Sequence, residues 1–341
     1  MKKTIAVDHG NRLIKTTNHV FPANCIDGTR LASVGGDTLK YNGKEVVLTN
    51  DLQLQLNDKT IDDRYYNLNL AAIAKELAFE EASTGVKYSS GETIEITLLI
   101  GLPLAHCKEL GPKYVDYFKQ CRPLTFEFNG KFYNIHITKV MYYPQGVSAV
   151  FATRDNFKGL RDVYVADIGG FTLDGFRMTN QKGRLMPDPT SCISLYCGVN
   201  RLFDRTNAIA HSKGSMHDIP VGIMEGFLRK DVTTKNEITP KRSGFITTAA
   251  MEHTEDMLSQ LSHNGCDLEE DFIVFMGGGS LLLEDYVLQS NRLTKGCSFI
   301  NNIKANVEGY SILHTLEEKS KSTPASNVTT INRPTGVGAA G

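Results

Sequence analysis

One pattern occurs twice in this chain, at positions separated by nearly half its length. In each copy an apolar strand ends in an aspartate, a tight turn with glycine follows, and a second strand returns. The copies occupy residues 5–15 and 164–174, and their aspartates are Asp8 and Asp167. Repetition of this unit indicates a chain built from two related α/β halves that face each other across a cleft.

The residue types in the repeated pattern suit the binding of phosphate. Glycine in a tight turn lets backbone N–H groups approach phosphate oxygens, because no Cβ is in the way. An aspartate at a strand end can hold Mg²⁺ through water, since Mg²⁺ keeps several of its waters. One such turn alone is most often an ordinary hairpin. Two copies, each after a hydrophobic strand, favour a site that grips a triphosphate from both sides.

Length and charge restrict the function classes. The chain has 341 residues and a net charge of −1, from Lys+Arg 37 and Asp+Glu 38. This length is typical of about two domains. The balanced charge gives no global basic excess, which disfavours direct, non-specific binding of nucleic acid. A role with DNA would therefore run through a partner protein.

The cysteines and apolar runs indicate a cytoplasmic protein without a membrane segment. The seven cysteines are odd in number and contain no pair at Cys-x-x-Cys spacing, so neither a disulfide framework nor a zinc site is expected. Asp8 interrupts the first apolar run before it reaches the length of a signal peptide. The stretch over residues 94–105 is too short to span a bilayer.

Apolar periodicity and turn residues predict alternating strands and helices. Strands are expected over residues 4–8, 13–18, 94–101, 124–128, 132–140, 163–167, 171–178 and 272–276. Helices are expected over residues 67–83, 112–120, 145–156, 194–211, 222–230, 244–263, 280–290 and 307–319. In the longest of these helices the candidate core positions are Ile246, Ala249, Ala250, Met257 and Leu261.

Five segments resemble motifs of the actin superfamily, in the order in which that family has them. Residues 7–15 resemble its first phosphate loop, and residues 167–174 resemble the second in a form close to that of ParM-like plasmid actins. Residues 275–280 are similar to its adenosine motif, and residues 144–150 and 306–310 fall where its two connecting helices belong. The motifs extend over the chain from end to end.

The resemblance implies a role for each matching residue. Asp8 and Asp167 match positions that organise Mg²⁺ and its waters. Phosphate-contacting positions are matched by Gly10, Asn11, Lys15, Gly169, Gly170 and Thr172. Positions against the nucleoside are matched by Gly277, Gly278, Gly279 and Ser280.

Gln145 matches the position that orients the attacking water. ParM-like proteins often carry Glu there, whereas eukaryotic actin carries Gln, which cannot take a proton at neutral pH and would position the water. Asp167 is then the better candidate to influence the proton of that water. His9 and Asn11 depart from the small or acidic residues that are more usual in the first loop.

No motif fixes the residues that read the base. Glu225, Lys241 and Arg242 lie in the region that should border the adenine and ribose. The choice between ATP and GTP therefore stays open.

The architecture implied by the resemblance is α/β, a duplicated actin-like (ribonuclease H-like) fold with a nucleotide cleft between the halves. Domain I would span residues 1–155 with an insertion at about 30–90, and domain II residues 156–320 with an insertion at about 190–250. Residues 321–341, rich in Ser, Thr, Pro and Gly, would form a C-terminal tail that a neighbouring subunit could hold.

The function implied by the resemblance is that of a nucleoside triphosphatase that polymerises with Mg²⁺ and ATP or GTP. Its first partner would be itself, in a filament, and hydrolysis would weaken that filament. Its task would be to move plasmid copies apart through an adaptor protein bound to centromere-like DNA.

Alternatives on the same fold are a small-molecule kinase and a cell-shape or division actin. A kinase would place an aspartate as base for a substrate hydroxyl, whereas Gln145 occupies the water-facing position. Cytoskeletal actins of the second kind commonly carry a membrane-binding terminal helix, whereas Met1 is expected to lead straight into a strand and the tail from Ser320 shows no amphipathic stripe. A chaperone ATPase would need a long extension after Gly341. The sequence also contains no Walker-type phosphate loop and no nucleophile elbow.

Overall fold

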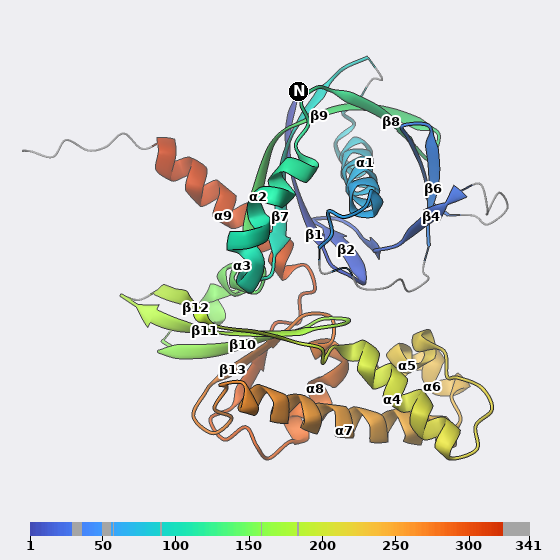
Figure 1. Cartoon of the computed structure of the whole chain (residues 1–341), viewed down its shortest axis with the longest axis vertical. Coiled ribbons are helices and arrows are strands. Elements are labelled where there is room, and N and C mark those ends of the chain that lie inside the picture. Colours follow the sequence, from blue (N-terminus) through green and yellow to red (C-terminus); the bar gives the residue numbers. More distant parts are fainter. Residues whose placement is uncertain are drawn as a thin grey trace, which may run out of the picture.

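The computed structural model describes residues 1–28, 36–49, 56, 58–88, 91–157, 159–182 and 184–322. Figure 1 shows two lobes, one built from the N-terminal part of the chain and one from the C-terminal part. The described strands fall into two sheets, one of nine strands and one of five. We call the lobe with the nine-stranded sheet the first lobe and the other the second lobe.

The five-stranded sheet repeats the order and direction of the first five strands of the larger one. In both sheets the central strand pairs antiparallel with the strand after it in sequence, and parallel with a later strand that follows a helix. The first lobe uses β3 (Val20–Pro22), β2 (Leu13–Thr16), β1 (Lys2–His9), β7 (Ile94–Leu102) and β9 (Lys131–Pro144), in that order. The second uses β12 (Arg184–Leu195), β11 (Leu173–Gln181), β10 (Asp162–Ile168), β13 (Ile273–Met276) and β14 (Cys297–Phe299). The predicted duplication is confirmed.

The larger sheet continues beyond β9 and curves around helix α1 (Arg64–Thr84), as Figure 1 shows. The buried residues of this helix lie between Tyr65 and Leu77, because side chains such as Leu68, Leu70 and Ile73 meet strands on several sides. The additional strands are β8 (Leu124–Phe128), β5 (Thr38–Tyr41), β6 (Lys44–Leu48) and β4 (Cys25–Asp27).

Helices cover the second sheet, and α7 (Pro240–His263) contributes a central part of that core. All five core positions expected on α7 are fully buried. Thr239 caps α7 by accepting a hydrogen bond from the backbone of Arg242, and a proline stands in its first turn. The other helices of this lobe are α4 (Val199–Ser212), α5 (Val221–Leu228), α6 (Val232–Glu237) and α8 (Ser280–Gln289).

Two helices connect the lobes. Helix α3 (Val147–Ala152) lies between them, and α9 (Ala305–Ser322) runs from the second lobe against β1 and β7 of the first, as Figure 1 shows. They cross closely at Gly309, where a Cβ would lie 2.0 Å from the backbone oxygen of Ser148. The crossing requires glycine at this position.

The helix expected over residues 145–156 is shorter than predicted. Gly146 has φ +76° and lies against the Phe176 ring, so regular helix begins at Val147. After α3 the chain turns through a 3₁₀ segment, Arg154–Phe157. Gln145 consequently precedes the helix and stands at the end of β9.

The helix expected over residues 194–211 was wrong at its start. Residues up to Leu195 belong to β12, whose pairing with β11 sets Ser194 opposite Asp174, and α4 begins at Val199. Pairing along a neighbouring strand overrides local preference here. Helix α2 (Cys107–Phe118), after the 3₁₀ turn Leu104–His106, also begins earlier than expected and contains Pro112. Strands β3, β4, β12 and β14 and helix α6 were not predicted.

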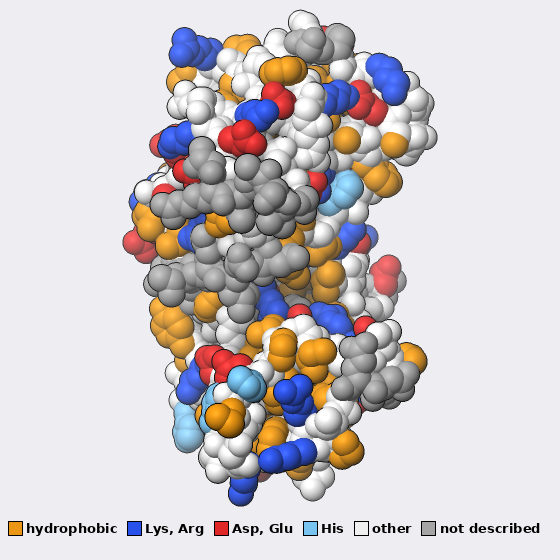
Figure 2. Space-filling view, turned by 90° about the vertical axis from the view of Figure 1, so that its right-hand side faces the viewer, with side chains coloured by type: hydrophobic (Ala, Val, Ile, Leu, Met, Phe, Trp, Pro, Cys, Tyr) orange, Lys and Arg blue, Asp and Glu red, His pale blue; other side chains and the backbone are white. Residues whose placement is uncertain are grey.

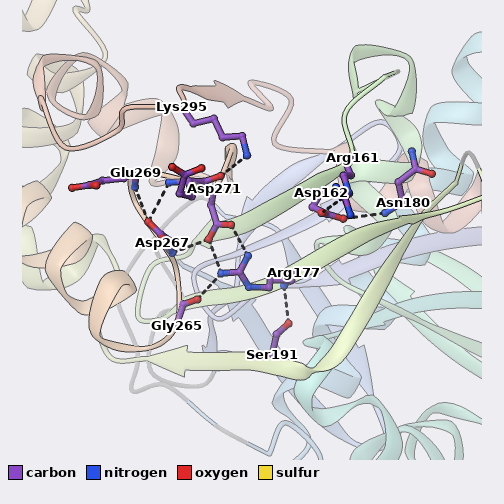
Figure 3. Close-up of polar contacts among 11 residues, drawn as sticks. Arg161, Asp162, Arg177, Asn180, Ser191, Gly265, Asp267, Glu269, Asp271 and Lys295 are labelled. Carbon is purple, nitrogen blue, oxygen red and sulfur yellow. Dashed lines mark hydrogen bonds and ion pairs between the residues drawn. The ribbon is translucent and has the colours of Figure 1, made fainter.

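A partly buried ion pair connects β11 of the second sheet to the loop before β13. In Figure 3, Arg177 of β11 points at Asp271, with which it makes two hydrogen bonds. The same guanidinium donates to the backbone oxygen of Gly265 at 2.7 Å. A planar fork on a carboxylate fixes both distance and orientation, so this contact holds the entry of β13 in place.

The predicted tail, residues 321–341, lies outside the described residues from 323 onward, and the first predicted insertion lies partly outside them. Among the helices of the described residues, none has the length and apolar character needed to cross a bilayer. On the face in Figure 2, basic and acidic side chains of the described residues are interspersed.

Candidate functional site

The first repeated unit places an ion pair at the end of β1. Asp8 and Lys15 are register partners on β1 and β2, and the lysine Nζ lies 3.0 Å from the aspartate Oδ2. The turn between them contains Gly10, where a Cβ would lie 2.5 Å from the Leu13 backbone oxygen. The tightness of this turn therefore requires glycine and leaves its backbone open on the cleft side.

The second repeated unit places two carboxylates at the matching positions. Asp167 of β10 and Asp174 of β11 are register partners, and Thr172 donates to Asp174 at 3.1 Å. The backbone N–H of Gly169 closes the turn on the Thr172 oxygen at 2.8 Å. The two halves thus differ at one equivalent position, since Lys15 in the first corresponds to Asp174 in the second.

The three-glycine loop after β13 packs on the second turn. Gly277 has φ +87°, and a Cβ there would lie 2.3 Å from the Asp167 Oδ1. The N–H of Gly279 donates to the backbone oxygen of Ile168 at 2.9 Å. Ser280 is fully buried, and its hydroxyl donates to the Gly277 oxygen at 2.8 Å, so its side chain faces the loop.

Gln145 reaches the first unit from the end of β9. Its Nε2 donates to the Asp8 Oδ1 at 2.6 Å, and its backbone N–H donates to Leu102 at 2.8 Å. The next N–H, of Gly146, donates to the Asn306 side chain in the first turn of α9. Gln145 is therefore fixed at both backbone and side chain where the lobes meet.

These elements surround one pocket between the lobes, which opens to solvent. Of the predicted site residues, Ser280 alone does not line it. Those that do are Asp8, Gly10, Asn11, Lys15, Gln145, Asp167, Gly169, Gly170, Thr172, Gly277, Gly278 and Gly279.

Charged residues to which the resemblance assigned no role also line the pocket: Arg12, Lys59, Asp174 and Arg229. Glu225 lines it as well, where it forms an ion pair with Arg12. Lys241 and Arg242, from the same predicted region, are exposed on α7 and lie outside the lining. Glu225 and Arg229 are spaced i, i+4 on and after α5, and this spacing of opposite charges is visible in the sequence.

The buried charges at one end of the pocket shift each other's pKa values. Burial and then Asp174 raise the pKa of Asp167 to about 7. Burial alone would raise the pKa of Asp8, but Lys15 and the Gln145 donor outweigh it and lower that pKa. Burial lowers the pKa of Lys59 to about 8 despite the nearby Asp8. Clustered perturbed groups in a cleft are typical of functional sites.

A cleft lined from both sides by duplicated strand–turn–strand units defines the class as an actin-type nucleotide fold. Residues 6–147 match the family described as actin-like proteins, N-terminal domain. The chain has an actin-like fold, which it shares with solved ParM structures. No curated protein sequence matches it.

Solved structures share this fold over nearly the whole chain at low sequence identity. A 15-stranded ParM filament from Clostridium botulinum is 17% identical, covers 93% of this chain and 100% of its own, and has a TM-score of 0.67. An archaeal actin homologue in complex with ADP is 16% identical, with coverage of 92% and 99% and a TM-score of 0.63. A ParM from Bacillus thuringiensis with AMPPNP is 15% identical, with coverage of 92% and 98% and a TM-score of 0.60.

Proposed function

We propose that this protein binds a nucleoside triphosphate, ATP or GTP, in the interlobe pocket and hydrolyses it. The observation that carries the proposal is that the two glycine turns, one after Asp8 and one after Asp167, line opposite walls of one pocket. Backbone N–H groups in such turns bind anions, and two facing turns can hold a chain of phosphates between them. Similarity in fold to an ADP complex and an AMPPNP complex supports the same ligand class.

The acidic residues of the pocket fit a role for Mg²⁺. Asp8, Asp167 and Asp174 line it, and Mg²⁺ prefers carboxylate oxygens, phosphate oxygens and water. The raised pKa of Asp167 reflects burial and repulsion from Asp174, which a divalent cation would offset. Bound Mg²⁺ supplies neutralisation of the charge on the phosphate oxygens. Asp8 and Asp167 would hold the ion and its waters.

The hydrolytic step is in-line attack of water on the terminal phosphorus, with release of phosphate and the diphosphate. Gln145 orients the water, because its side chain is fixed by Asp8 but carries no titrating group. Asp167 is the carboxylate available to influence the proton of that water. Gly10, Asn11, Lys15, Gly169, Gly170 and Thr172 would hold the phosphates. The residues act mainly through position and charge.

We further propose that the protein polymerises with triphosphate and separates plasmid copies in the cytoplasm. Two filament structures of related fold support self-association. The net charge of −1 and the interspersed surface charges favour an adaptor protein as the link to DNA. Binding of triphosphate would bring the lobes together, and loss of the terminal phosphate would weaken the filament.

The test is right-angle light scattering of the purified protein with Mg²⁺ and ATP, GTP or a non-hydrolysable analogue, with phosphate release followed in parallel. We expect scattering to rise on addition of one triphosphate and to decay as phosphate appears. Flat scattering over a wide protein concentration range, despite phosphate release, would exclude the filament and favour a kinase-like or monomeric nucleotidase.

A matched pair of variants assigns the activity to the pocket. Asp167→Asn removes a pocket carboxylate, whereas Asp162→Asn removes an exposed carboxylate at the other end of the same strand, visible in Figure 3. We expect phosphate release to be lost in the first variant and kept in the second. Equal activity in both would place the reaction elsewhere.

A further inference from the structure

Lys59 is a buried cation that enters the pocket from a segment with no phosphate-binding motif. It lies just before α1, is 9% exposed and lines the pocket. Its Nζ donates to the backbone oxygen of His9 and lies 5.3 Å from the centre of the Tyr65 ring. A buried ammonium is costly unless polar or anionic groups surround it, so its placement here calls for an explanation.

The backbone that carries Lys59 is held in place by several contacts. Asp58 accepts hydrogen bonds from the N–H and the hydroxyl of Thr60 and pairs with Lys113 of α2. The N–H of Lys59 itself donates to the Tyr114 hydroxyl at 3.2 Å, also on α2. The lysine is therefore positioned by α2 and does not simply follow a loose loop.

The surroundings of Lys59 assign it to one end of the pocket. Its electrostatic neighbours include Asp8, Lys15 and Asp174, and Asp8 is the partner of Gln145. Arg12 and Glu225 pair with each other on the α5 side. Because Gln145 marks where the attacking water would stand, the terminal phosphate would lie on the same side as Lys59.

An ammonium group has three N–H donors. Among the described residues the hydrogen-bond acceptor of the Lys59 ammonium is the His9 oxygen, at the base of the first glycine turn. No other acceptor of these N–H groups lies among the described residues, so they can meet oxygens of a ligand in the pocket. A charged hydrogen bond to a phosphate oxygen, in a site from which water is largely displaced, is among the strongest that a lysine can make.

We propose that Lys59 binds the terminal phosphate and makes the site select triphosphate over diphosphate. This inference rests on the proposed nucleotide function and deepens it. Asp58 and Tyr114 attach the Lys59 segment to α2. A contact between Lys59 and the terminal phosphate would therefore connect α2, which lies outside the phosphate loop, to the bound phosphate.

The experiment compares binding of a non-hydrolysable triphosphate analogue and of the diphosphate by calorimetry, with Mg²⁺ in both titrations. Lys59→Gln keeps a hydrogen-bond donor at this position but carries no charge. We expect its affinity for the triphosphate to fall about tenfold or more, which corresponds to roughly 1.4 kcal/mol or more, with diphosphate affinity changed less than about threefold.

Lys75→Gln is the matched control. Lys75 is a partly buried lysine of the same lobe that pairs with Asp37 and packs near Phe21, and it lies outside the pocket. We expect it to keep the wild-type ratio of triphosphate to diphosphate affinity. Lys59→Arg keeps the positive charge and should retain most of the ratio of triphosphate to diphosphate affinity. This variant also tests the inference if Lys59→Gln fails to fold.

Three results would overturn the inference. An equal loss of affinity for both nucleotides would make Lys59 a general pocket cation, and unchanged affinity for both would remove it from the site. If the ratio of triphosphate to diphosphate affinity were as low in Lys59→Arg as in a folded Lys59→Gln, the positive charge of Lys59 would not be what selects the triphosphate. If the wild-type protein binds neither nucleotide, the proposed nucleotide function itself fails, and this result is distinct from the other three.

Discussion

Arg12 and Glu225 form an ion pair across the pocket, with 2.9 Å between the arginine Nη2 and the glutamate Oε1. Arg12 belongs to the turn between β1 and β2 in the first lobe, whereas Glu225 lies on α5 in the second. The guanidinium also lies 5.3 Å from the centre of the Phe203 ring on α4. The pair therefore joins the lobes beside the space where a nucleotide would lie.

Breaking this pair should speed the release of nucleotide. We expect Arg12→Ala and Glu225→Ala each to raise the dissociation rate about tenfold, because a contact that holds the lobes together is lost. The double variant should be no faster than the quicker single variant, since both changes remove one interaction. Stopped-flow displacement of a fluorescent nucleotide measures these rates.

The control for this prediction is Lys230→Ala. Lys230 pairs with Asp285 near the same helix but lies outside the pocket. Its loss should leave the dissociation rate unchanged. If the effects of Arg12→Ala and Glu225→Ala multiply in the double variant, each residue contacts the nucleotide on its own and the bridge is not what retains it.

Gln145 should affect turnover more than binding. Its side chain donates one hydrogen bond to Asp8 in the pocket. Replacing that side chain leaves the backbone groups of both glycine turns in place. We expect Gln145→Ala to lower kcat at least about tenfold with KM changed much less. Single-turnover phosphate release separates the chemical step from product release.

Gln120→Ala provides the comparison for Gln145. Gln120 hydrogen-bonds Tyr66 and the Ile137 backbone in the first lobe, away from the pocket. Its removal can cost stability but should leave kcat unchanged. A Gln145 variant that raises KM and keeps kcat would show that this residue serves binding and does not orient water.

The parts of the site that were predictable from sequence are those that depend on local geometry. A tight turn after a strand needs glycine whatever surrounds it, so Gly10 and Gly169 could be recognised from their neighbours alone. The repeat then placed Asp8 and Asp167 opposite each other. In the same way, the long apolar periodicity of α1 and α7 fixed both helices, because each buries a regular set of side chains.

The parts that were missed depend on contacts between distant segments. Lys59 meets His9 across 50 positions of sequence, and Arg12 meets Glu225 only once both lobes have formed. Neither pair leaves a local pattern. The start of α4 was misassigned for a related reason, since residues up to Leu195 become a strand only by pairing with β11.

Gly101 should tolerate no side chain. A Cβ there would lie 1.7 Å from the Tyr310 hydroxyl and 3.0 Å from the Gln145 Cγ. Gly101→Ala must therefore displace Tyr310, which is fully buried on α9, and disturb Gln145. We expect a loss of about 1–3 kcal/mol in the free energy of unfolding, measured by urea titration.

Gly244→Ala is the opposite case. Gly244 is exposed within α7, and an added Cβ would meet no atom within 4 Å. Replacing glycine by alanine inside a helix should stabilise the protein by about 0.5–1 kcal/mol. Equal effects of the two substitutions would mean that close packing at Gly101 relaxes without cost.

His253 should make the folded protein sensitive to mild acid. Its ring lies on the buried face of α7 and is 1% exposed. Burial, reinforced by Arg205 and Arg201, lowers the pKa of His253 to about 4, whereas an unfolded histidine has a pKa of about 6.5. Between these values the unfolded chain binds a proton that the folded protein does not, so stability falls as pH decreases from 6.5 toward 4.

The free energy of unfolding should fall by roughly 1.4 kcal/mol for each pH unit below 6.5. At higher pH this dependence vanishes, because both the folded and the unfolded state carry neutral His253. Urea titrations between pH 5 and 7.5 measure it. His253→Leu should remove this contribution, whereas His263→Leu, a change at an exposed position of the same helix, should keep it. A pH dependence that is identical in wild type and His253→Leu would mean that the buried ring takes up its proton without unfolding.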